Sequence, residues 1–341
     1  MTKKRVDTKL RVEKSSKISG RLLNKSKIKT LPEKHYYVLP QLMDGDAPKQ
    51  LIKAYFFEKG FNGKKKNKKS WKKYMAKSAE KWYPHESLIE FMINQIGEII
   101  GVHMNQTKML FINKQLRFLS KIFTSKNLRL VHGAEICGDH LNDEQMARAI
   151  ANNKQDARDL FTIEFLDEAI HSIYPKEHNL ILNGLIKMIA FDTIVGNNDR
   201  HFYNWGVLDS VNKNVSFKPQ LSPIYDSARG LMWNFNDEKI KHLLDIRKNQ
   251  GSRRIEKYTK EAQPRISFEK DTSCNHFDLL EHILNKYQCK ELIKPMASLE
   301  IENIVIQHIR DNFARFYISE RQEIIELILT LRFNHVRTLC Q

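Results

Sequence analysis

One stretch of the sequence constrains the fold more than any other. Residues 179–195, "NLILNGLIKMIAFDTIV", are mostly apolar with helical spacing, which predicts a buried helix. Asn183, Lys187 and Asp192 interrupt the run, which argues against a membrane span. The run leads directly into "GNNDRHFYNWG", residues 196–206, where acidic, basic and amide side chains crowd together. Such a loop is either a catalytic loop or a polar turn between two buried elements.

The patterns on either side of this stretch divide the chain into two parts. Strand-like runs rich in aromatic and β-branched residues occur early, with one clear helix at 86–100 that stops at Gly101. Helical patterns dominate later, at 143–153, 157–173, 179–195, 276–287, 300–317 and 320–339. We therefore predict an α+β fold with a small mixed lobe at 1–125 and a larger helical lobe at 126–341. The small lobe would carry a basic N-terminal arm and a lysine-rich insertion at 59–81.

The charge balance indicates polyanionic partners without choosing among them. Lys and Arg total 57 against 40 Asp and Glu, a formal net charge of +17. Nucleic acid, anionic lipid headgroups, nucleotides and inositol phosphates all fit this excess, and so does a simple solvated surface. The 4 cysteines form no CxxC pair, which argues against a zinc site, and so few cysteines in a long chain argue against a disulfide framework. The first residues lack an apolar core, so no Sec-type signal peptide is expected.

Three oxygen-bearing residues give the polar loop its chemical interest. Asp199 could orient a hydroxyl nucleophile and accept its proton, and Asn204 follows five positions later with an oxygen suited to Mg²⁺. A second carboxylate, Asp226, occurs in "SPIYDSARG" after a short apolar run. Each residue alone is a weak signal, but Asp, Asn and a later Asp in this order are typical of phosphoryl transfer by kinases.

These segments resemble a known family. "FDTIVGNNDRHFYNWGVL" followed by "LSPIYDSA" is similar to the loop "gNxDrHxxNxg" and the strand end "aPiYDs" of HipA-like Ser/Thr protein kinases. The resemblance is strongest over residues 180–341, and it looks closest to stand-alone bacterial kinases delivered into host cells. It implies a bilobal protein-kinase-like fold, ATP and Mg²⁺ as cofactors and a protein substrate. It also implies a location either in the cytoplasm or, after secretion, in a host cell.

The resemblance also implies a role for each residue of the loop. Asp199 would be the catalytic base, and Asn204 and Asp226 would be Mg²⁺ ligands. Arg200 and His201 follow the aspartate as in the family. His201 is expected to support the loop, whereas Arg200 would pair either with a phosphate or with a nearby carboxylate.

A kinase also needs a lysine for the α- and β-phosphates and a helix glutamate to position it. We predict Lys53, within the strand-like run "QLIKAYFF", as the lysine and Glu90 as its partner. Glu90 precedes Gly101 by the eleven residues that the family shows, whereas Glu86 is an alternative one turn earlier. The phosphate loop is harder to place: "SSKISGRLLNK" resembles the family's "SxSGxxxK" only at Ser19 and Gly20, and a basic arm is an equal interpretation.

The lysine-rich insertion suggests a regulatory ligand. If "KKKNKKSWKKYMAKSAEKW" is helical, four lysines fall near one face: Lys65, Lys69, Lys72 and Lys73. This face could bind an inositol polyphosphate, an anionic membrane lipid or nucleic acid, and binding could complete a Lys53–Glu90 pair. A solvated insertion without a ligand is the competing interpretation.

Two alternative functions remain open from the sequence. "DRHxxN" is also similar to the catalytic loop of phosphoinositide 3- and 4-kinases, so a phosphoinositide kinase is possible, although "PIYDSA" favours the HipA-like interpretation. The basic composition would also suit a nucleic-acid-binding component of a toxin–antitoxin pair.

Overall fold

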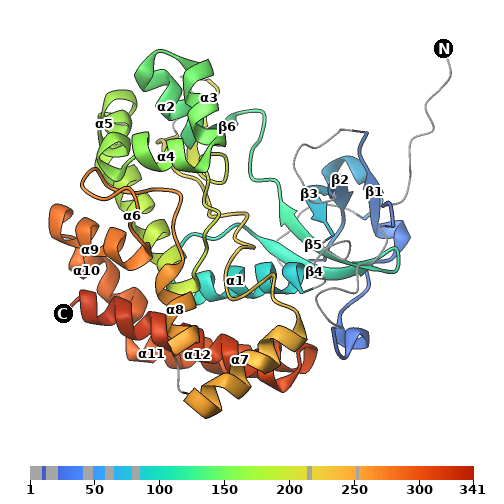
Figure 1. Ribbon diagram of the computed structural model, residues 1–341. Coiled ribbons are helices and arrows are strands. Elements are labelled where there is room, and N and C mark those ends of the chain that lie inside the picture. Colours follow the sequence, from blue (N-terminus) through green and yellow to red (C-terminus); the bar gives the residue numbers. More distant parts are fainter. Residues whose placement is uncertain are drawn as a thin grey trace.

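The computed structural model describes residues 10–12, 22–40, 49–57, 65–78, 85–212, 217–250 and 253–341; for residues 246–250 it describes the backbone only. These residues form a small lobe built around a β-sheet and a larger lobe of helices (Figure 1). The α+β, bilobal prediction is therefore confirmed. The predicted boundary at 125/126 falls in the connection between strands β5 and β6.

The small lobe contains an antiparallel five-stranded sheet in the order β1-β2-β3-β5-β4. Its strands are β1 (Tyr36–Val38), β2 (Lys49–Ala54), β3 (Lys72–Lys77), β4 (Thr107–Ile112) and β5 (Gln115–Lys121). Short 3₁₀ helices lie at Lys25–Lys27, Glu33–His35 and Lys68–Ser70. One face of the sheet buries a separate apolar cluster that includes Ile52, Tyr74 and Leu119. Because side chains alternate along a strand, the remaining side chains, including that of Lys77 on β3, point from the opposite face of the sheet.

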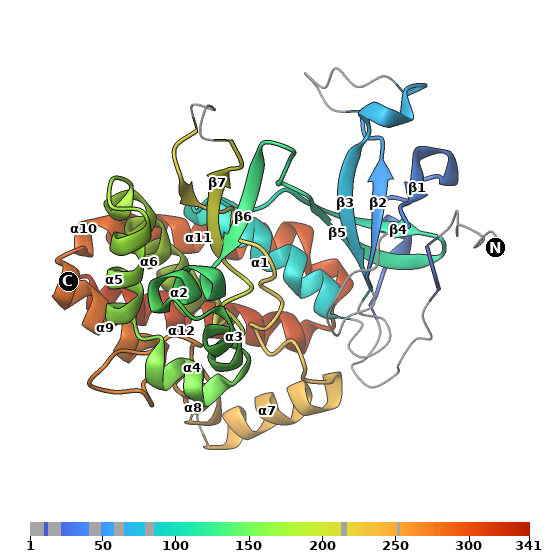
Figure 2. The same cartoon turned by 90° about the horizontal axis from the view of Figure 1, so that it is seen from above.

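Helix α1 (Glu86–Ile100) connects the sheet to the large lobe. It ends at Gly101, which takes a φ of 87° and is therefore suited to the left-handed cap position. Its buried face joins the main core, and the helix packs against β4 and β5 on one side and α6 and α11 on the other. Figure 2 shows α1 between the strands and the C-terminal helices. A side chain on α1 can therefore contact residues of both lobes.

The large lobe is helical throughout its core. Its elements are α2 (Gly133–Leu141), α3 (Glu144–Asn152), α4 (Lys154–Leu160), α5 (Ile163–Ile173), α6 (His178–Val195), α7 (Asp237–Gln250), α8 (Arg253–Glu261), α9 (His276–Tyr287), α10 (Lys290–Ile293), α11 (Leu299–Asn312) and α12 (Ser319–Leu339). Two 3₁₀ helices lie at Lys294–Ala297 and Ala314–Phe316. The predicted single helix at 157–173 is two helices, because the Thr162 side chain caps α5 by accepting a hydrogen bond from Phe165 N. No helix among the described residues is long and apolar enough to cross a membrane.

A second, three-stranded sheet frames the polar loop. It consists of β6 (Leu128–His132), β7 (Gly206–Ser210) and β8 (Gln220–Leu221) in that order. The loop at 196–205 therefore lies between the buried helix α6 and strand β7, and Asp226 follows β8. Ile224 exchanges backbone hydrogen bonds with the segment after α1, through His103 O and Asn105 N. The end of α1 and the segment before Asp226 are thus fixed to each other.

Candidate active site

Lys77 is the central cation of the cleft between the lobes. Its Nζ donates to Glu90 Oε1 at 2.9 Å and to Asp226 Oδ1 at 2.6 Å. Glu90 is on α1 and 3% exposed, whereas Asp226 belongs to the segment after β8 in the other lobe. One side chain from the sheet therefore holds a helix glutamate and the predicted metal-binding aspartate together.

The electrostatics of this trio follow from burial and from one cation being shared by two carboxylates. Burial would lower the pKa of Lys77, but Asp226 and Glu90 outweigh that effect and raise it. Burial would raise the pKa of Asp226, but Lys77 lowers it overall. Burial does raise the pKa of Glu90, to about 7, because Lys77 offsets the desolvation only in part. The trio keeps Asp226 ionised while Glu90 titrates near neutral pH.

The predicted Lys53–Glu90 pair is wrong, because Lys77 takes that place. Lys53 is on β2 and donates its Nζ to Lys69 O at 2.9 Å. Lys53 pairs with Lys73 across the sheet, whereas Lys77 pairs with Lys49. Lys53 is therefore four residues along the strands from the position of Lys77. The choice of Glu90 over Glu86 as the pairing glutamate agrees with the structure.

The polar loop is built around Arg200, which is only 3% exposed. Arg200 Nε donates to Asp192 Oδ2 and Nη2 to Asp192 Oδ1, both at 2.8 Å. Asp192 is the polar interruption of α6, and it also accepts from Asn197 Nδ2 at 2.9 Å. Of the two roles predicted for Arg200, the structure shows the carboxylate pair. A phosphate contact would need a more exposed guanidinium.

Arg200 also brings the two predicted metal ligands to one place. Its Nη1 donates to Asn204 O at 3.1 Å and to Tyr225 O, the residue before Asp226. Its Nη2 donates to Ser227 Oγ at 2.7 Å, the residue after Asp226. A single buried guanidinium therefore fixes the backbone at both ligands.

The remaining loop residues orient one another. Asn204 Nδ2 donates to Asp199 O at 3.0 Å, so its amide oxygen is turned away from the loop backbone. His201 Nδ1 accepts from Tyr203 N at 3.2 Å, and His201 O accepts from Asn204 N at 2.8 Å. These contacts are those of a loop support, as predicted for His201. Desolvation also lowers its pKa, so the imidazole is neutral at physiological pH.

The loop is anchored to the large lobe through its aromatic residues. Trp205 is 1% exposed, and its carbonyl accepts from Gly133 N at 3.1 Å. A Cβ on Gly133 would overlap the Trp205 ring, so only glycine leaves room for this contact. Phe202 is fully buried, and its carbonyl accepts from Ala134 N at 3.0 Å. The start of α2 therefore clamps both ends of the turn that presents Asn204.

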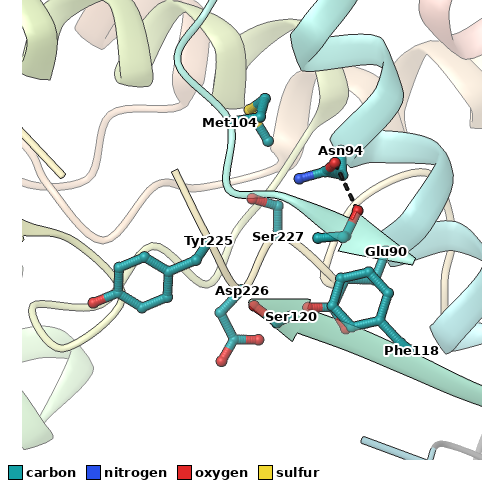
Figure 3. A pocket seen from close by; sticks show the side chains of 9 residues that line it. Glu90, Asn94, Met104, Phe118, Ser120, Tyr225, Asp226 and Ser227 are labelled. Atoms are coloured by element: carbon teal, nitrogen blue, oxygen red, sulfur yellow. Dashed lines mark hydrogen bonds between the residues drawn. The ribbon is translucent and has the colours of Figure 1, made fainter. Parts of the chain in front are cut away.

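A small cavity lies behind Asp226. It is lined by residues from α1, β5 and the segment after β8, including Glu90, Asn94, Phe118, Ser120, Tyr225, Asp226 and Ser227 (Figure 3). Asp226 takes a φ of 55°, a left-handed backbone conformation that is uncommon for a residue other than glycine. Such conformations cluster at functional sites, where the surrounding contacts enforce them. Here the flanking bonds to Arg200 provide that enforcement.

The lysine-rich insertion differs from the prediction. Residues 72–77 form strand β3 and residues 68–70 a 3₁₀ turn, so the four candidate lysines do not share a helical face. Lys72 and Lys73 are neighbours on a strand and point to opposite faces of the sheet. Lys65 and Lys69 are exposed in the segment before it. Binding of a polyanion here stays a prediction. Ser19 and Gly20, the predicted phosphate-loop residues, lie outside the described residues.

Two lysines were missed in the sequence. Lys77 is the last residue of β3, and Lys49 is its direct cross-strand neighbour on β2. Lys49 lies close enough to Asp226 for its charge to contribute to the lowered pKa of that aspartate. The pairing of β2 with β3, rather than a local motif, brings these two lysines together.

The residues present suit Mg²⁺ bound together with a nucleotide. Asp226 uses Oδ1 for Lys77 and keeps a second oxygen, on a side chain that is 32% exposed. Among the described residues, no group of three His, Cys, Asp or Glu could hold a metal. Mg²⁺ is usually held by one or two protein oxygens plus water and phosphate oxygens, which matches a pair of Asn204 and Asp226.

Comparisons with known proteins place this geometry in a family. The model of the HipA-like C-terminal domain matches residues 43–299. The chain belongs to the HipA-like family. No curated protein has a sequence significantly similar to this one.

Solved structures support the kinase-like fold of this HipA-like protein. It is similar to the Helicobacter pylori proinflammatory kinase CtkA, with a TM-score of 0.65 and 19% identity over 89% of this chain and 95% of that one. It also matches HipA of Shewanella oneidensis, solved with HipB and operator DNA, with a TM-score of 0.44 and 11% identity over 94% of this chain and 73% of that one. The first match shows a shared fold; the second is too distant to add to it.

Proposed function

We propose that this HipA-like protein is an ATP- and Mg²⁺-dependent protein kinase that phosphorylates serine or threonine. The observation that carries the proposal is Lys77, which joins Glu90 of α1 to Asp226. A strand lysine paired with a helix glutamate beside a metal-binding aspartate is the arrangement that positions ATP in protein kinases. Family membership and the fold shared with a kinase support the same conclusion.

Each group of the site has a defined task in this reaction. Lys77, assisted by Lys49, would bind the α- and β-phosphates, and Asn204 and Asp226 would hold Mg²⁺. When bound, Mg²⁺ neutralises charge on the phosphate oxygens. The Asp199 carboxylate would orient the acceptor hydroxyl and take up its proton late in transfer. Arg200 would keep these groups in register without touching the nucleotide.

The test is phosphate transfer from ATP labelled on its γ-phosphate. Wild type should label itself or a generic basic protein, whereas Asp199→Asn and Asp226→Asn should lose about 10²-fold or more in rate. Asp311→Asn, a change at an exposed position of α11, serves as the matched control. If wild type labels no protein and does not bind Mg²⁺·ATP, the proposal is wrong. Label on phosphoinositide vesicles alone would instead indicate a lipid kinase.

A further inference from the structure

Two arginines from outside the polar loop converge on Asp199. Arg265 Nη2 donates to Asp199 Oδ1 at 2.8 Å, and Arg229 Nε lies 3.8 Å from Asp199 Oδ2. Arg229 stacks its guanidinium 4.0 Å from the centre of the Trp233 ring, which fixes its direction. The place where an acceptor hydroxyl must approach Asp199 is therefore bordered by cations.

The segment that carries Arg265 is held by a buried arginine. Arg158 of α4 is 2% exposed and donates to Thr272 O at 3.0 Å, Cys274 O at 2.8 Å and Pro264 O. Among the described residues, Arg158 hydrogen-bonds backbone carbonyls and forms no ion pair with a carboxylate, although its charge acts on Asp271. Burying a charge in this way is costly. The position of the 264–274 segment, and with it Arg265, is therefore closely specified.

A third cation stands at the same edge. Lys154, the first residue of α4, is exposed and has no hydrogen bond or ion pair within the part of the chain that the structure describes. Desolvation by the neighbouring protein and the charges of Arg265 and Arg158 lower its pKa, and Asp199 acts in the opposite sense. Lys154 begins the same short helix whose Arg158 holds the segment that carries Arg265, so it lies at this edge, and its charge acts together with those of Arg265 and Asp199.

The charges around Asp199 do not balance. The other carboxylates of the site are already engaged: Asp192 pairs with Arg200, and Asp226 pairs with Lys77. The remaining acid nearby, Glu86, faces Arg229, whose charge opposes the effect of burial on the Glu86 pKa. Asp199 is then left to offset Arg265 and Arg229, with both of which it forms an ion pair, as well as the nearby charge of Lys154. Arg265 donates to Asp199 through Nη2, and its Nε is buried, so Nη1 is the nitrogen whose donors remain for a second anion.

We propose that this edge of the cleft recognises an anionic group next to the phosphorylated residue of the substrate. Arg265 and Lys154 would bind a carboxylate or phosphate group on the peptide while Asp199 binds the acceptor hydroxyl. Guanidinium forks suit both kinds of anion, and a lysine adds a flexible point charge. The proposal rests on the proposed kinase function and names the substrate class for it: serine or threonine flanked by acidic or phosphorylated residues.

The experiment compares three peptides with one acceptor serine each. They differ only in the two residues that flank the serine. In the first peptide both are glutamate, in the second both are phosphoserine, and in the third both are glutamine. A phosphoserine cannot itself accept phosphate, because its hydroxyl already carries one. Wild type should show a kcat/KM about two- to fivefold higher for the two anionic peptides than for the glutamine peptide, as expected for one partly exposed ion pair. The preference should lie in KM and shrink as NaCl is raised from 0.05 to about 0.5 M.

Substitutions then assign the preference to the proposed residues. Lys154→Gln should reduce the ratio of kcat/KM values to about half of its wild-type value or less. Arg265→Met should reduce it further, whereas Arg265→Lys should retain part of it because the charge remains. Lys294→Gln, at an exposed position on a distant 3₁₀ helix, removes the same charge and should leave the ratio unchanged.

The outcomes separate this inference from the function on which it rests. Equal kcat/KM values for all three peptides, or a preference that Lys154→Gln and Arg265→Met leave intact, would overturn the anion site while the kinase function stands. Transfer to glutamate but not to phosphoserine peptides would identify a carboxylate as the anion, and the reverse would identify a phosphate. No transfer to any peptide, with no self-labelling and no Mg²⁺·ATP binding, would overturn both proposals.

Discussion

Lys77 and Asp226 form a 2.6 Å ion pair across 149 residues of sequence and between the two lobes. Lys77 approaches from the last position of β3, and Asp226 from the segment that Arg200 fixes on both sides. The ion pair therefore forms only when the sheet of the small lobe and the polar loop of the large lobe are correctly positioned relative to each other. A nucleotide bound at Lys77 would meet its metal ligands at this junction.

Lys77→Met should abolish most phosphate transfer. The change removes the cation that would bind the phosphates and leaves Glu90 buried without its partner. We expect a fall in kcat/KM of about 10²-fold or more and a loss of about 3 kcal/mol in unfolding free energy. Transfer of labelled phosphate and chemical denaturation measure the two effects.

Lys53→Met is the matched control for that variant. Lys53 is also a lysine of the sheet, but among the described residues its ammonium group donates only to Lys69 O, so both effects should be small. If Lys53→Met were inactive and Lys77→Met active, the assignment of the phosphate lysine made from the structure would be wrong.

Removing Arg200 should destabilise the large lobe as well as inactivate the site. Arg200→Met strands the Asp192 carboxylate, which is 3% exposed, and we expect a loss of about 3–5 kcal/mol in unfolding free energy. Chemical denaturation at neutral pH measures it. Asp192→Asn combined with Arg200→Met should recover part of that loss, because the buried charge is then absent. Additive losses in the double variant would show that the two side chains are not coupled.

The polar loop and the helical lobe were predictable because their signals are local. Asp199, Asn204 and Asp226 follow one another along a short length of chain, and the helices at 86–100 and 276–287 begin and end where their patterns do. The helix break at Thr162 was missed because a capping threonine within an otherwise continuous apolar pattern is easily taken for helix interior.

The lysine of the small lobe was not predictable by the same means. Lys77 sits in a lysine-rich run, and nothing in its immediate neighbourhood separates it from Lys72 or Lys73. What selects it is the pairing of β3 with β2 and β5, which sets the face and the distance at which each lysine meets Glu90. Such pairing is a long-range property of the sheet. The cations around Asp199 were missed for the same reason, since Arg265 reaches it across 66 residues.

The raised pKa of Glu90 predicts a pH dependence of stability. Burial raises the pKa of this carboxyl to about 7, above its value in the unfolded chain, so the folded state binds the proton more tightly. Its contribution to stability is full below the unfolded pKa and is lost as pH rises through about 7. The unfolding free energy of wild type should therefore fall between pH 5 and about 7.5 more steeply than that of Glu90→Gln.

Denaturation in urea at several pH values measures this difference in slope. Glu291→Gln removes an exposed carboxylate on α10 and should reproduce the wild-type curve. Parallel curves for wild type and Glu90→Gln would mean that Glu90 titrates as it does in the unfolded chain.

Gly206→Ala should disturb the polar loop through a steric overlap. Gly206 is the first residue of β7 and pairs with His132, and a Cβ there would collide with the carbonyl of Val131. Relief requires β6 and β7 to separate, which would shift Asn204, two residues before the glycine. We expect a loss of about 1–3 kcal/mol in unfolding free energy, with phosphate transfer reduced even where the variant remains folded. Ser210→Ala, at the other end of the same strand, removes only the exposed hydrogen bonds between Ser210 Oγ and Asn212 and should retain activity and most of the stability. Equal losses in the two variants would show that β7 tolerates change poorly along its whole length, rather than at the glycine.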